Sequence, residues 1–175
     1  MSETKTLTAI SSEGLNQLKE KAHAAPEAFR VVSKAVTVCR GGFLNETAIR
    51  GLSVMIDEPP HLLGTNTAPN PSEQVLAALG ACLSVGYMAN ATAEGIDLEE
   101  IRLELEGDID ISPVWGVAHV PDDQIAGFTT IRVKATVKGQ VPDDQLQLLH
   151  ERVLRWSPVA NTLRNPVKII AELDG

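Results

Sequence analysis

The order of the predicted elements indicates an α+β fold with antiparallel sheet. Segments rich in β-branched or alternating residues precede a long apolar helix, and two more alternating segments and a second helix follow it. Strands grouped on both sides of a helix favour antiparallel pairing over the strand–helix alternation of a parallel sheet. The long helix is apolar on more than one face and needs cover that one small sheet cannot give. We therefore expect an intertwined homodimer.

Length, composition and charge limit the classes of function. The chain has 175 residues and is 43% hydrophobic, which is enough for one domain with its own core. Its formal net charge of -8 argues against nucleic acid or an anionic membrane as a partner, since phosphate binding needs clustered Lys and Arg. No run of about 18 apolar residues occurs, and the N-terminus lacks a secretory signal pattern. We expect a cytoplasmic protein with no membrane span.

The N-terminal third predicts a helical extension followed by a β-meander. Residues 11–29 indicate a mostly exposed helix that Pro26 closes. We therefore expect the chain to divide into an N-terminal helical extension, residues 1–29, and a single domain, residues 30–175. Runs of β-branched and alternating residues predict the strands of the meander. These strands are expected at residues 30–39, 46–50 and 52–56.

A long helix is predicted over residues 71–94. Asn70 is a good N-cap, Pro71 suits the first helical position, and Gly95 suits the position after the helix. Cys82 lies among Ala and Gly residues whose small side chains leave room for a ligand or a second chain beside the sulfur. Apolar side chains recur at three- and four-residue spacing. They are Val75, Leu76, Leu79, Leu83 and Tyr87.

The C-terminal half predicts two long strands, a broken helix and a last strand. Residues 100–111 and 128–138 alternate between apolar and polar side chains, as in a half-buried sheet. A loop over 112–127 connects them. Ser157-Pro158 interrupts the helix that follows the second strand. The remaining elements are expected to be a helix at residues 142–156, a short turn or helix at 159–164, and a strand at 167–173.

The predicted long helix carries a recognisable motif. Asn70-Pro71-x-Glu73, followed by Leu76-Ala77-Ala78-Leu79-Gly80-Ala81-Cys82, resembles the helix signature of the OsmC/Ohr family of peroxide-resistance proteins. The resemblance covers about residues 30–173, in the same order of elements. It implies an OsmC-like fold, in which antiparallel sheets wrap around long central helices in an intertwined homodimer. It also implies thiol-dependent reduction of organic hydroperoxides, an antioxidant role in the oxidative stress response.

Two residues of this helix match the catalytic residues of the family. Cys82 matches the cysteine that attacks peroxide as a thiolate and becomes a sulfenic acid; the alternative is a small buried hydrophobe. Glu73 matches an acidic residue near the helix start; the alternative is a favourable interaction with the helix dipole. Nine residues at about 100° each place the two side chains on opposite faces, about 13–14 Å apart along the axis. Glu73 would therefore serve the Cys82 of a second subunit.

The sequence departs from the family pattern at two positions. Ser157 stands where the family has a resolving cysteine, and serine cannot form a disulfide, so an external thiol reductant is expected. Cys39 is expected to be a buried residue of the meander rather than a substitute. The arginine that the family carries shortly before Asn-Pro is missing from residues 56–65. Arginines that could reach the site from elsewhere are Arg40, Arg50, Arg155 and Arg164.

Three further residues are candidates for a pocket near the thiol. Trp156 could wall an apolar pocket or anchor the core, and Tyr87 is a second lining candidate. His61 could assist the thiolate, or be a solvated loop histidine. The histidines show no metal-ligand spacing and no glycine-rich phosphate loop follows a strand, so neither a metal nor a cofactor is expected. The histidines are His23, His61, His119 and His150.

Two functions remain open from the sequence. The first is a one-cysteine peroxidase that reduces a small-molecule organic hydroperoxide at Cys82 and is regenerated by an external thiol. The second is a non-catalytic protein of the same fold that binds a small apolar ligand or senses oxidation at Cys82. Cys82 and Glu73 favour the first function. Ser157 and the missing arginine favour the second.

Overall fold

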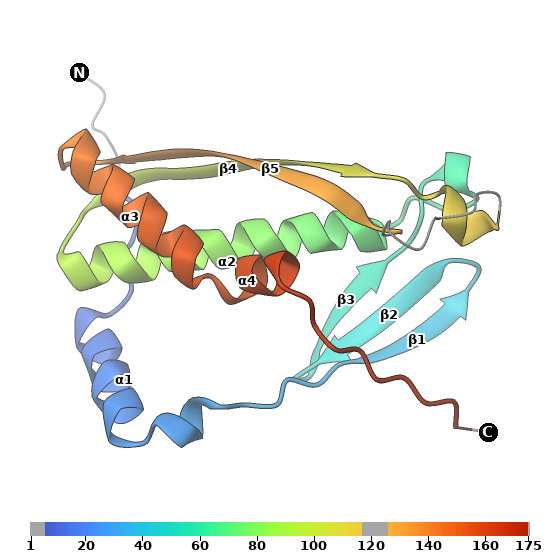
Figure 1. Cartoon of the computed structure of the whole chain (residues 1–175), viewed down its shortest axis with the longest axis horizontal. Helices are drawn as coiled ribbons and strands as arrows, with labels where there is room; N and C mark the ends of the chain where they lie inside the picture. The colour runs from blue at the N-terminus through green and yellow to red at the C-terminus, as the bar shows by residue number, and fades with distance from the viewer. Residues whose placement is uncertain (1–5, 117–125, 175) are drawn as a thin grey trace. The chain divides into compact units, whose positions relative to one another are not determined.

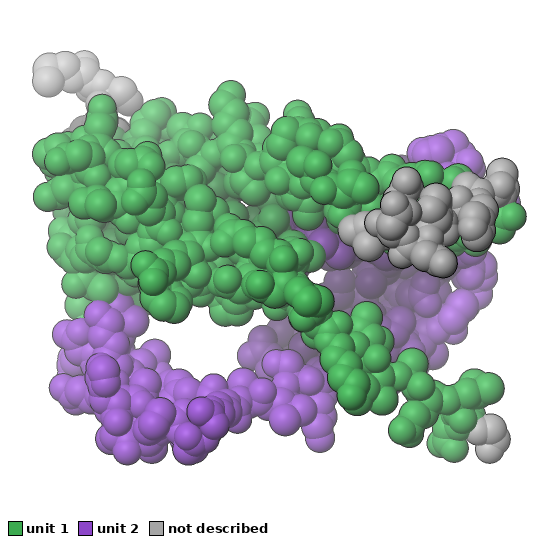
Figure 2. Space-filling view, in the orientation of Figure 1, with its two compact units in different colours: residues 1–12, 79–175 green, residues 13–78 purple. Residues whose placement is uncertain are grey.

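The computed structural model describes residues 6–116 and 126–174 and has an α+β architecture with two antiparallel sheets (Figure 1). The α+β class with antiparallel sheets expected from the sequence is therefore confirmed, and the intertwined homodimer stays a prediction. The chain divides into two compact units, which Figure 2 distinguishes by colour. Unit 1 comprises residues 1–12 and 79–175, and unit 2 comprises residues 13–78. The proposed boundary between an extension at 1–29 and a domain at 30–175 stays a prediction.

Unit 2 contains the predicted helix and meander. The helix α1 (Ser12–Ala24) buries none of its residues, and Pro26 begins a separate short 3-10 helix, η1 (Pro26–Phe29). The three strands pair in sequence order as an antiparallel meander. They are β1 (Val36–Gly41), β2 (Leu44–Ile49) and β3 (Leu52–Ile56).

The first strand begins six residues later than expected, at Val36 instead of residue 30. Val36 lies opposite Ala48, and β2 ends one residue further on, at Ile49. Residues before Ala35 therefore have no residue of β2 opposite them. Their β-branched side chains favour an extended backbone, but a strand also needs a hydrogen-bonded neighbour.

The meander is mostly exposed on both faces. Every residue of β1 is exposed, including Cys39, so the expectation that Cys39 is buried was wrong. Alternation predicts which side chains share a face, but it does not say whether anything covers that face. Within the meander, only Thr47 is buried, and its hydroxyl lies 2.9 Å from the hydroxyl of Thr37.

The segment between β3 and α2 is organised by one buried carboxylate. Asp57 is 1% exposed, and its Oδ2 accepts hydrogen bonds from the backbone N–H and the hydroxyl of both Thr65 and Thr67, at 2.6–3.1 Å. The hydrogen bond from the Thr65 hydroxyl, and then that from the Thr67 backbone, hold the pKa of Asp57 well below its ordinary value. A Cβ at Gly64 would overlap the carbonyl oxygen of Glu58, so only glycine fits this loop. The loop includes the 3-10 helix η2 (Pro60–Leu62).

The long helix α2 (Pro71–Glu94) begins and ends where the sequence predicts. At its C-terminus Gly95 has a φ of 68°, which L side chains rarely adopt. The N–H groups of Gly95 and Ile96 donate to the carbonyls of Thr92 and Ala91, at 3.3 and 2.9 Å. These two bonds form a Schellman motif that satisfies helix-end carbonyls.

Unit 1 has its own hydrophobic core. The strands β4 (Leu98–Ile109) and β5 (Phe128–Gly139) form a long antiparallel ribbon that lies along one side of α2 (Figure 1). The helices α3 (Asp143–Trp156) and α4 (Pro158–Arg164) complete the unit. The short η3 (Ser112–Trp115) lies in the predicted 112–127 loop, of which residues 117–125 lie outside the described residues. The buried core residues are Leu79, Leu83, Tyr87, Ala91, Ile96, Leu98, Leu149, Val153 and Ala160.

Small residues of α2 allow its neighbours to approach closely. A Cβ at Gly80 would lie 3.0 Å from Leu105 Cδ1 on β4, and one at Gly86 would lie 3.0 Å from Val153 Cγ1 on α3. The alternating apolar face of the ribbon packs against the same core. The small-residue pattern noted in the sequence therefore serves close packing within unit 1.

The strand expected at residues 167–173 was a wrong prediction, because these residues have no regular secondary structure. Val167, Ile169, Ile170 and Leu173 are 60–100% exposed. The alternating pattern favours an extended backbone, but neither described sheet includes this segment as a strand.

By length and composition alone, α2 also qualifies as a helix that could cross a membrane, with a mean hydropathy of 1.5. This is weak evidence, because the core helix of a soluble protein passes the same test. One face of α2 supplies Leu79, Leu83, Tyr87 and Ala91 to the core of unit 1.

Candidate functional site

The structure places Cys82 next to Ser157. Cys82 is half-buried on α2, and the Ser157 hydroxyl donates a hydrogen bond to its Sγ at 3.2 Å. Ser157 is 5% exposed, and its Oγ also accepts the backbone N–H of Ala160 at 3.2 Å. The candidate thiol and the residue at the resolving position are therefore in contact, although they lie 75 residues apart in the chain.

Local sequence signals explain why Ser157 occupies this position. It lies between α3 and α4 and acts as the N-cap of α4, with Pro158 at the first helical position. A residue before proline avoids helical backbone angles, and Ser157 has φ -64° and ψ 119°. Its N–H remains bound to the carbonyl of Val153 at 3.0 Å. The helix break expected from the sequence is thus confirmed, and it aims a hydroxyl at the sulfur.

A second polar contact joins α2 and α3 within unit 1. The Tyr87 hydroxyl is hydrogen-bonded to Nδ1 of His150, and the two rings stack with centroids 6.1 Å apart. Tyr87 is 1% exposed, and burial raises the pKa of its hydroxyl to about 12. Tyr87 therefore lies in the core of unit 1.

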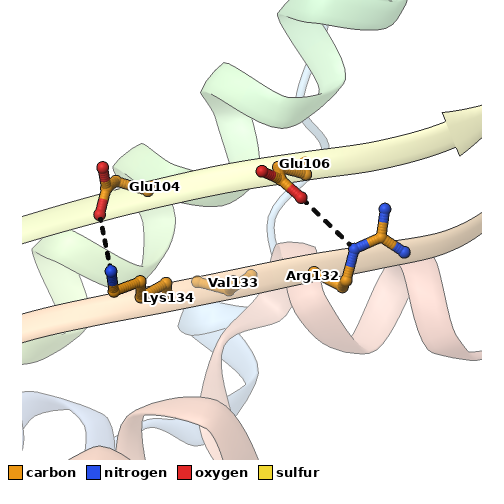
Figure 3. A pocket seen from close by; sticks show the side chains of 5 residues that line it. All are labelled: Glu104, Glu106, Arg132, Val133 and Lys134. Atoms are coloured by element: carbon orange, nitrogen blue, oxygen red, sulfur yellow. Dashed lines mark ion pairs between the residues drawn. The ribbon is translucent and has the colours of Figure 1, made fainter.

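Cys82 lines neither of two shallow hollows that the described residues of unit 1 form. One, of about 330 Å³, lies between β5 and α3 and is lined on the α3 side by Asp143, Gln147 and His150. The other, of about 350 Å³, lies on the charged face of the ribbon. Figure 3 shows its cross-strand ion pairs, Glu104 with Lys134 and Glu106 with Arg132. Neither hollow is the apolar pocket expected beside the thiol.

Glu73 is an exposed residue in the first turn of α2, where it forms a capping box with Asn70. The Glu73 N–H donates to Asn70 Oδ1, and the Asn70 N–H donates to Glu73 Oε2, both at 2.8 Å. This reciprocal pair satisfies two backbone donors at the helix start and confirms Asn70 as the N-cap. The carboxylate thus has a structural role in its own chain. Its service to Cys82 of a second subunit stays a prediction.

The other candidate residues make contacts of their own. Trp156 is 68% exposed, and the guanidinium of Arg155 lies 5.0 Å from its ring centroid, so Trp156 is not a core anchor. Arg164 donates to the carbonyl of Leu154 at 3.1 Å. In unit 2, Arg40 pairs with Glu46, and His61 is an exposed residue of η2.

Residues 6–116 and 126–174 contain no candidate metal-binding site. No group of three or more His, Cys, Asp or Glu side chains there is arranged to hold a metal ion. His119 lies outside the described residues.

Sequence reasoning missed two groups. Asp57 organises the loop before α2, and the spacing of Thr65 and Thr67 after it was the available signal. The hydrogen bond from Ser157 to Cys82 was also missed. Ser before Pro is a helix-start signal, but only the tertiary packing shows which side chain that hydroxyl meets.

Comparisons with known proteins give a consistent family. The sequence matches the family model described as OsmC-like protein over residues 64–172. Curated proteins gave no match.

Similar solved structures extend the comparison to the fold. One is an OsmC-like protein from Mycoplasma pneumoniae, with TM-score 0.65, 16% identity, and coverage of 78% of this chain and 89% of that one. Another is an OsmC-like protein of unknown function from Vibrio cholerae, with TM-score 0.63, 13% identity, and coverage of 75% and 93%. A third is an organic hydroperoxide resistance protein, OsmC, from Legionella pneumophila, with TM-score 0.55, 19% identity, and coverage of 77% and 90%. At these identities the likeness shows the fold.

Proposed function

The chain belongs to the family of OsmC-like proteins, and on that premise we propose that it reduces organic hydroperoxides with Cys82 as its only reacting cysteine. The observation that carries the proposal is the half-buried Cys82 sulfur with the Ser157 hydroxyl donating to it. Some proteins of similar structure are organic hydroperoxide resistance proteins, which gives the substrate class.

The first half-reaction uses the thiolate of Cys82. Its sulfur attacks the outer oxygen of the hydroperoxide, so that an S–O bond forms and the O–O bond breaks. Sulfur is oxidised to a sulfenic acid, and the peroxide is reduced to an alcohol that leaves with a proton from solvent. The thiolate is the reactive form of a cysteine.

The second half-reaction needs an external thiol because Ser157 cannot supply a sulfur. A thiol attacks the sulfenic acid, forming a mixed disulfide with Cys82 and releasing water. A second thiol then attacks the mixed disulfide, which returns Cys82 to the thiol and leaves the reductant oxidised. A dihydrolipoyl protein or a low-molecular-weight thiol would serve.

Trapping of the sulfenic acid tests this proposal. The protein is treated with sub-stoichiometric cumene hydroperoxide in the presence of dimedone, and the adduct is located by mass spectrometry. We expect the adduct on Cys82, in the wild type and in Cys39→Ser, and none in Cys82→Ser. A wild-type protein without a Cys82 adduct, or with an adduct confined to the exposed Cys39, contradicts the proposal.

The role of position 157 can be tested separately. Ser157→Cys would place a second sulfur beside Cys82, because the present Oγ–Sγ distance is 3.2 Å. We expect peroxide to convert this variant to an internal disulfide, seen as a shift in mobility on a non-reducing gel, and turnover to become less dependent on added thiol. A variant that stays reduced after peroxide treatment contradicts the assignment of position 157.

We further propose that the protein works as a homodimer in the cytoplasm. The exposed apolar residues of unit 2 and of the C-terminal segment support association with a second copy, since large exposed patches are typical of interfaces. OsmC-like proteins are soluble, which supports the location. In the dimer, Glu73 would contact the Cys82 site of the second subunit. Unchanged thiol reactivity and unchanged peroxide turnover in Glu73→Gln would contradict that contact.

A second function is favoured by the serine at position 157, where the family has a resolving cysteine. Without a resolving cysteine, the sulfenic acid of Cys82 lasts until an external thiol arrives, as in a sensor of oxidation rather than an enzyme. Turnover measured with different reductants distinguishes the two functions. Multiple turnovers supported by any of them identify an enzyme, and a single oxidation per chain identifies a sensor or a ligand-binding protein.

A further inference from the structure

We propose that the Ser157 hydroxyl is the hydrogen-bond donor that stabilises the reacting thiolate of Cys82, an inference that rests on the proposed function. The contact is direct, with Ser157 Oγ 3.2 Å from Cys82 Sγ. Serine at this position therefore supplies a hydrogen-bond donor to the sulfur, besides removing the resolving thiol.

The other partner of the hydroxyl leaves its proton free for the sulfur. A serine hydroxyl has one proton and two lone pairs. The Ala160 N–H occupies one lone pair of Ser157 at 3.2 Å, and the proton remains available for the sulfur. A neutral thiol can donate to or accept from the hydroxyl, but a thiolate can only accept. The contact therefore favours the charged form of Cys82.

The donor is held in place before any reaction occurs. Ser157 is 5% exposed, and its N–H is bound to the carbonyl of Val153 at 3.0 Å. Its place as N-cap and the proline that follows restrict its backbone. Little further ordering is needed for the hydroxyl to reach the sulfur, and a hydrogen bond shielded from water is electrostatically stronger.

The basic side chains of α3 and α4 are engaged elsewhere in unit 1. On α3, His150 binds Tyr87, Arg152 pairs with Glu94, and Arg155 stacks on Trp156. On α4, Arg164 binds the carbonyl of Leu154. The ribbon carries its charged pairs on the face shown in Figure 3. The described arginines of unit 1 bind groups other than Cys82, and the donor at its sulfur is the neutral hydroxyl of Ser157.

The test measures how fast Cys82 is alkylated by iodoacetamide across a range of pH. All variants carry Cys39→Ser, so that only Cys82 reacts. Ser157→Gly removes the hydroxyl and costs little as an N-cap. Thr162→Ala is the matched control, since it removes a hydroxyl of α4 that binds Pro158 and not the sulfur. We expect the midpoint of the Ser157→Gly profile to move upward by about one pH unit, because hydrogen bonds to charged groups are the stronger ones. Thr162→Ala should leave it unchanged.

A second pair of variants, Ser157→Thr and Ser157→Val, tests the inference if Ser157→Gly does not fold. Thr and Val have the same branched shape, with a hydroxyl in Thr where Val has a methyl group, so Ser157→Thr should retain the parent midpoint and Ser157→Val should shift it upward. Equal midpoints within that pair overturn the inference, as does an unchanged midpoint in folded Ser157→Gly. Alkylation involves no peroxide. Loss of the shift therefore refutes the role of Ser157 alone, and loss of the dimedone adduct refutes the peroxidase alone.

Discussion

The two antiparallel sheets of this chain have similar local sequence patterns and opposite surroundings. In the ribbon of unit 1, alternate residues of β4 and β5 pair across the strands, Leu103 with Ala135 and Leu105 with Val133, and pack against the core. In the meander of unit 2, β1 is exposed along its whole length, and Leu52 of β3 is 63% exposed.

The difference shows that alternation gives a sheet two faces, whereas stability depends on what covers the apolar one. The ribbon is covered by helices of its own unit. The apolar residues of the meander have no such cover within unit 2, whose helix α1 buries nothing. Unit 2 instead has a local hydrogen-bond network around Asp57. We therefore expect unit 1 to be stabilised by its own core and unit 2 by association with a second copy.

The largest expected effect is in the core of unit 1. Leu149 on α3 is 0% exposed, and Leu149→Ala would leave a cavity. We expect a loss of about 2–5 kcal/mol in the free energy of unfolding, measured by urea denaturation. The control is Leu148→Ala, since the neighbouring Leu148 is 59% exposed and should change stability little. Equal effects of the two substitutions would contradict the assigned core.

The next prediction tests whether a second copy covers the apolar side chains of the meander. Leu52→Lys adds a charge to an exposed apolar position of β3, where a second copy would desolvate it. We expect the Kd of the dimer to rise at least about tenfold, about 1.4 kcal/mol, as measured by sedimentation. Leu18→Lys on α1 is a control of similar exposure. A wild-type protein that is a stable, folded monomer would remove the basis of this prediction.

A smaller effect concerns the pH dependence of unit 2. The pKa of Asp57 in the folded chain is lowered by its hydrogen bonds from Thr65 and Thr67, below the ordinary 3.8. A group with a lowered folded pKa stabilises the fold above its unfolded pKa, and this contribution is lost as the pH falls below about 3.8. We expect Asp57→Asn to remove part of the acid sensitivity of thermal unfolding between neutral and acidic pH. An acid sensitivity as steep as that of the wild type would show that other carboxylates carry it.

The smallest effect is expected on the charged face of the ribbon. Arg132 forms two hydrogen bonds of 2.6 Å with Asp108, but both side chains are more than half exposed. Exposed ion pairs contribute little because water and salt screen them. We expect Arg132→Gln to leave the melting temperature almost unchanged at both low and high salt. A loss comparable to that of Leu149→Ala would mean that this face is covered in the assembled protein.

Much of the fold could be predicted because its signals are local. The capping residues Asn70 and Gly95 mark the ends of α2, and the alternation on both strands of the ribbon marks its buried face. The strand expected at 167–173 failed for the opposite reason, since a strand depends on a neighbour that a local pattern does not supply.

The sequence predicted which residues belong to the candidate site, but not the contacts that they make. Cys82 and Ser157 were each recognised from their motif, but their hydrogen bond joins residues 75 positions apart. Tyr87 was expected to line a pocket, and it is buried against His150, 63 positions away. Glu73 was recognised as an acid at the helix start, and the structure adds the capping box that holds it.

The sequence by itself determined where α2 begins and ends, which faces of the ribbon and of α2 are apolar, and which cysteine lies in the family motif. Caps, turns and periodicity depend on interactions among a few neighbouring residues, so the local sequence is enough to predict them. Only the tertiary structure decided that the hydroxyl of Ser157 meets the sulfur of Cys82, and that the apolar face of the ribbon is covered whereas the meander is exposed. These outcomes depend on the packing of elements far apart in the chain, because close approach at Gly86 and Val153 sets which side chains of α2 and α3 can touch.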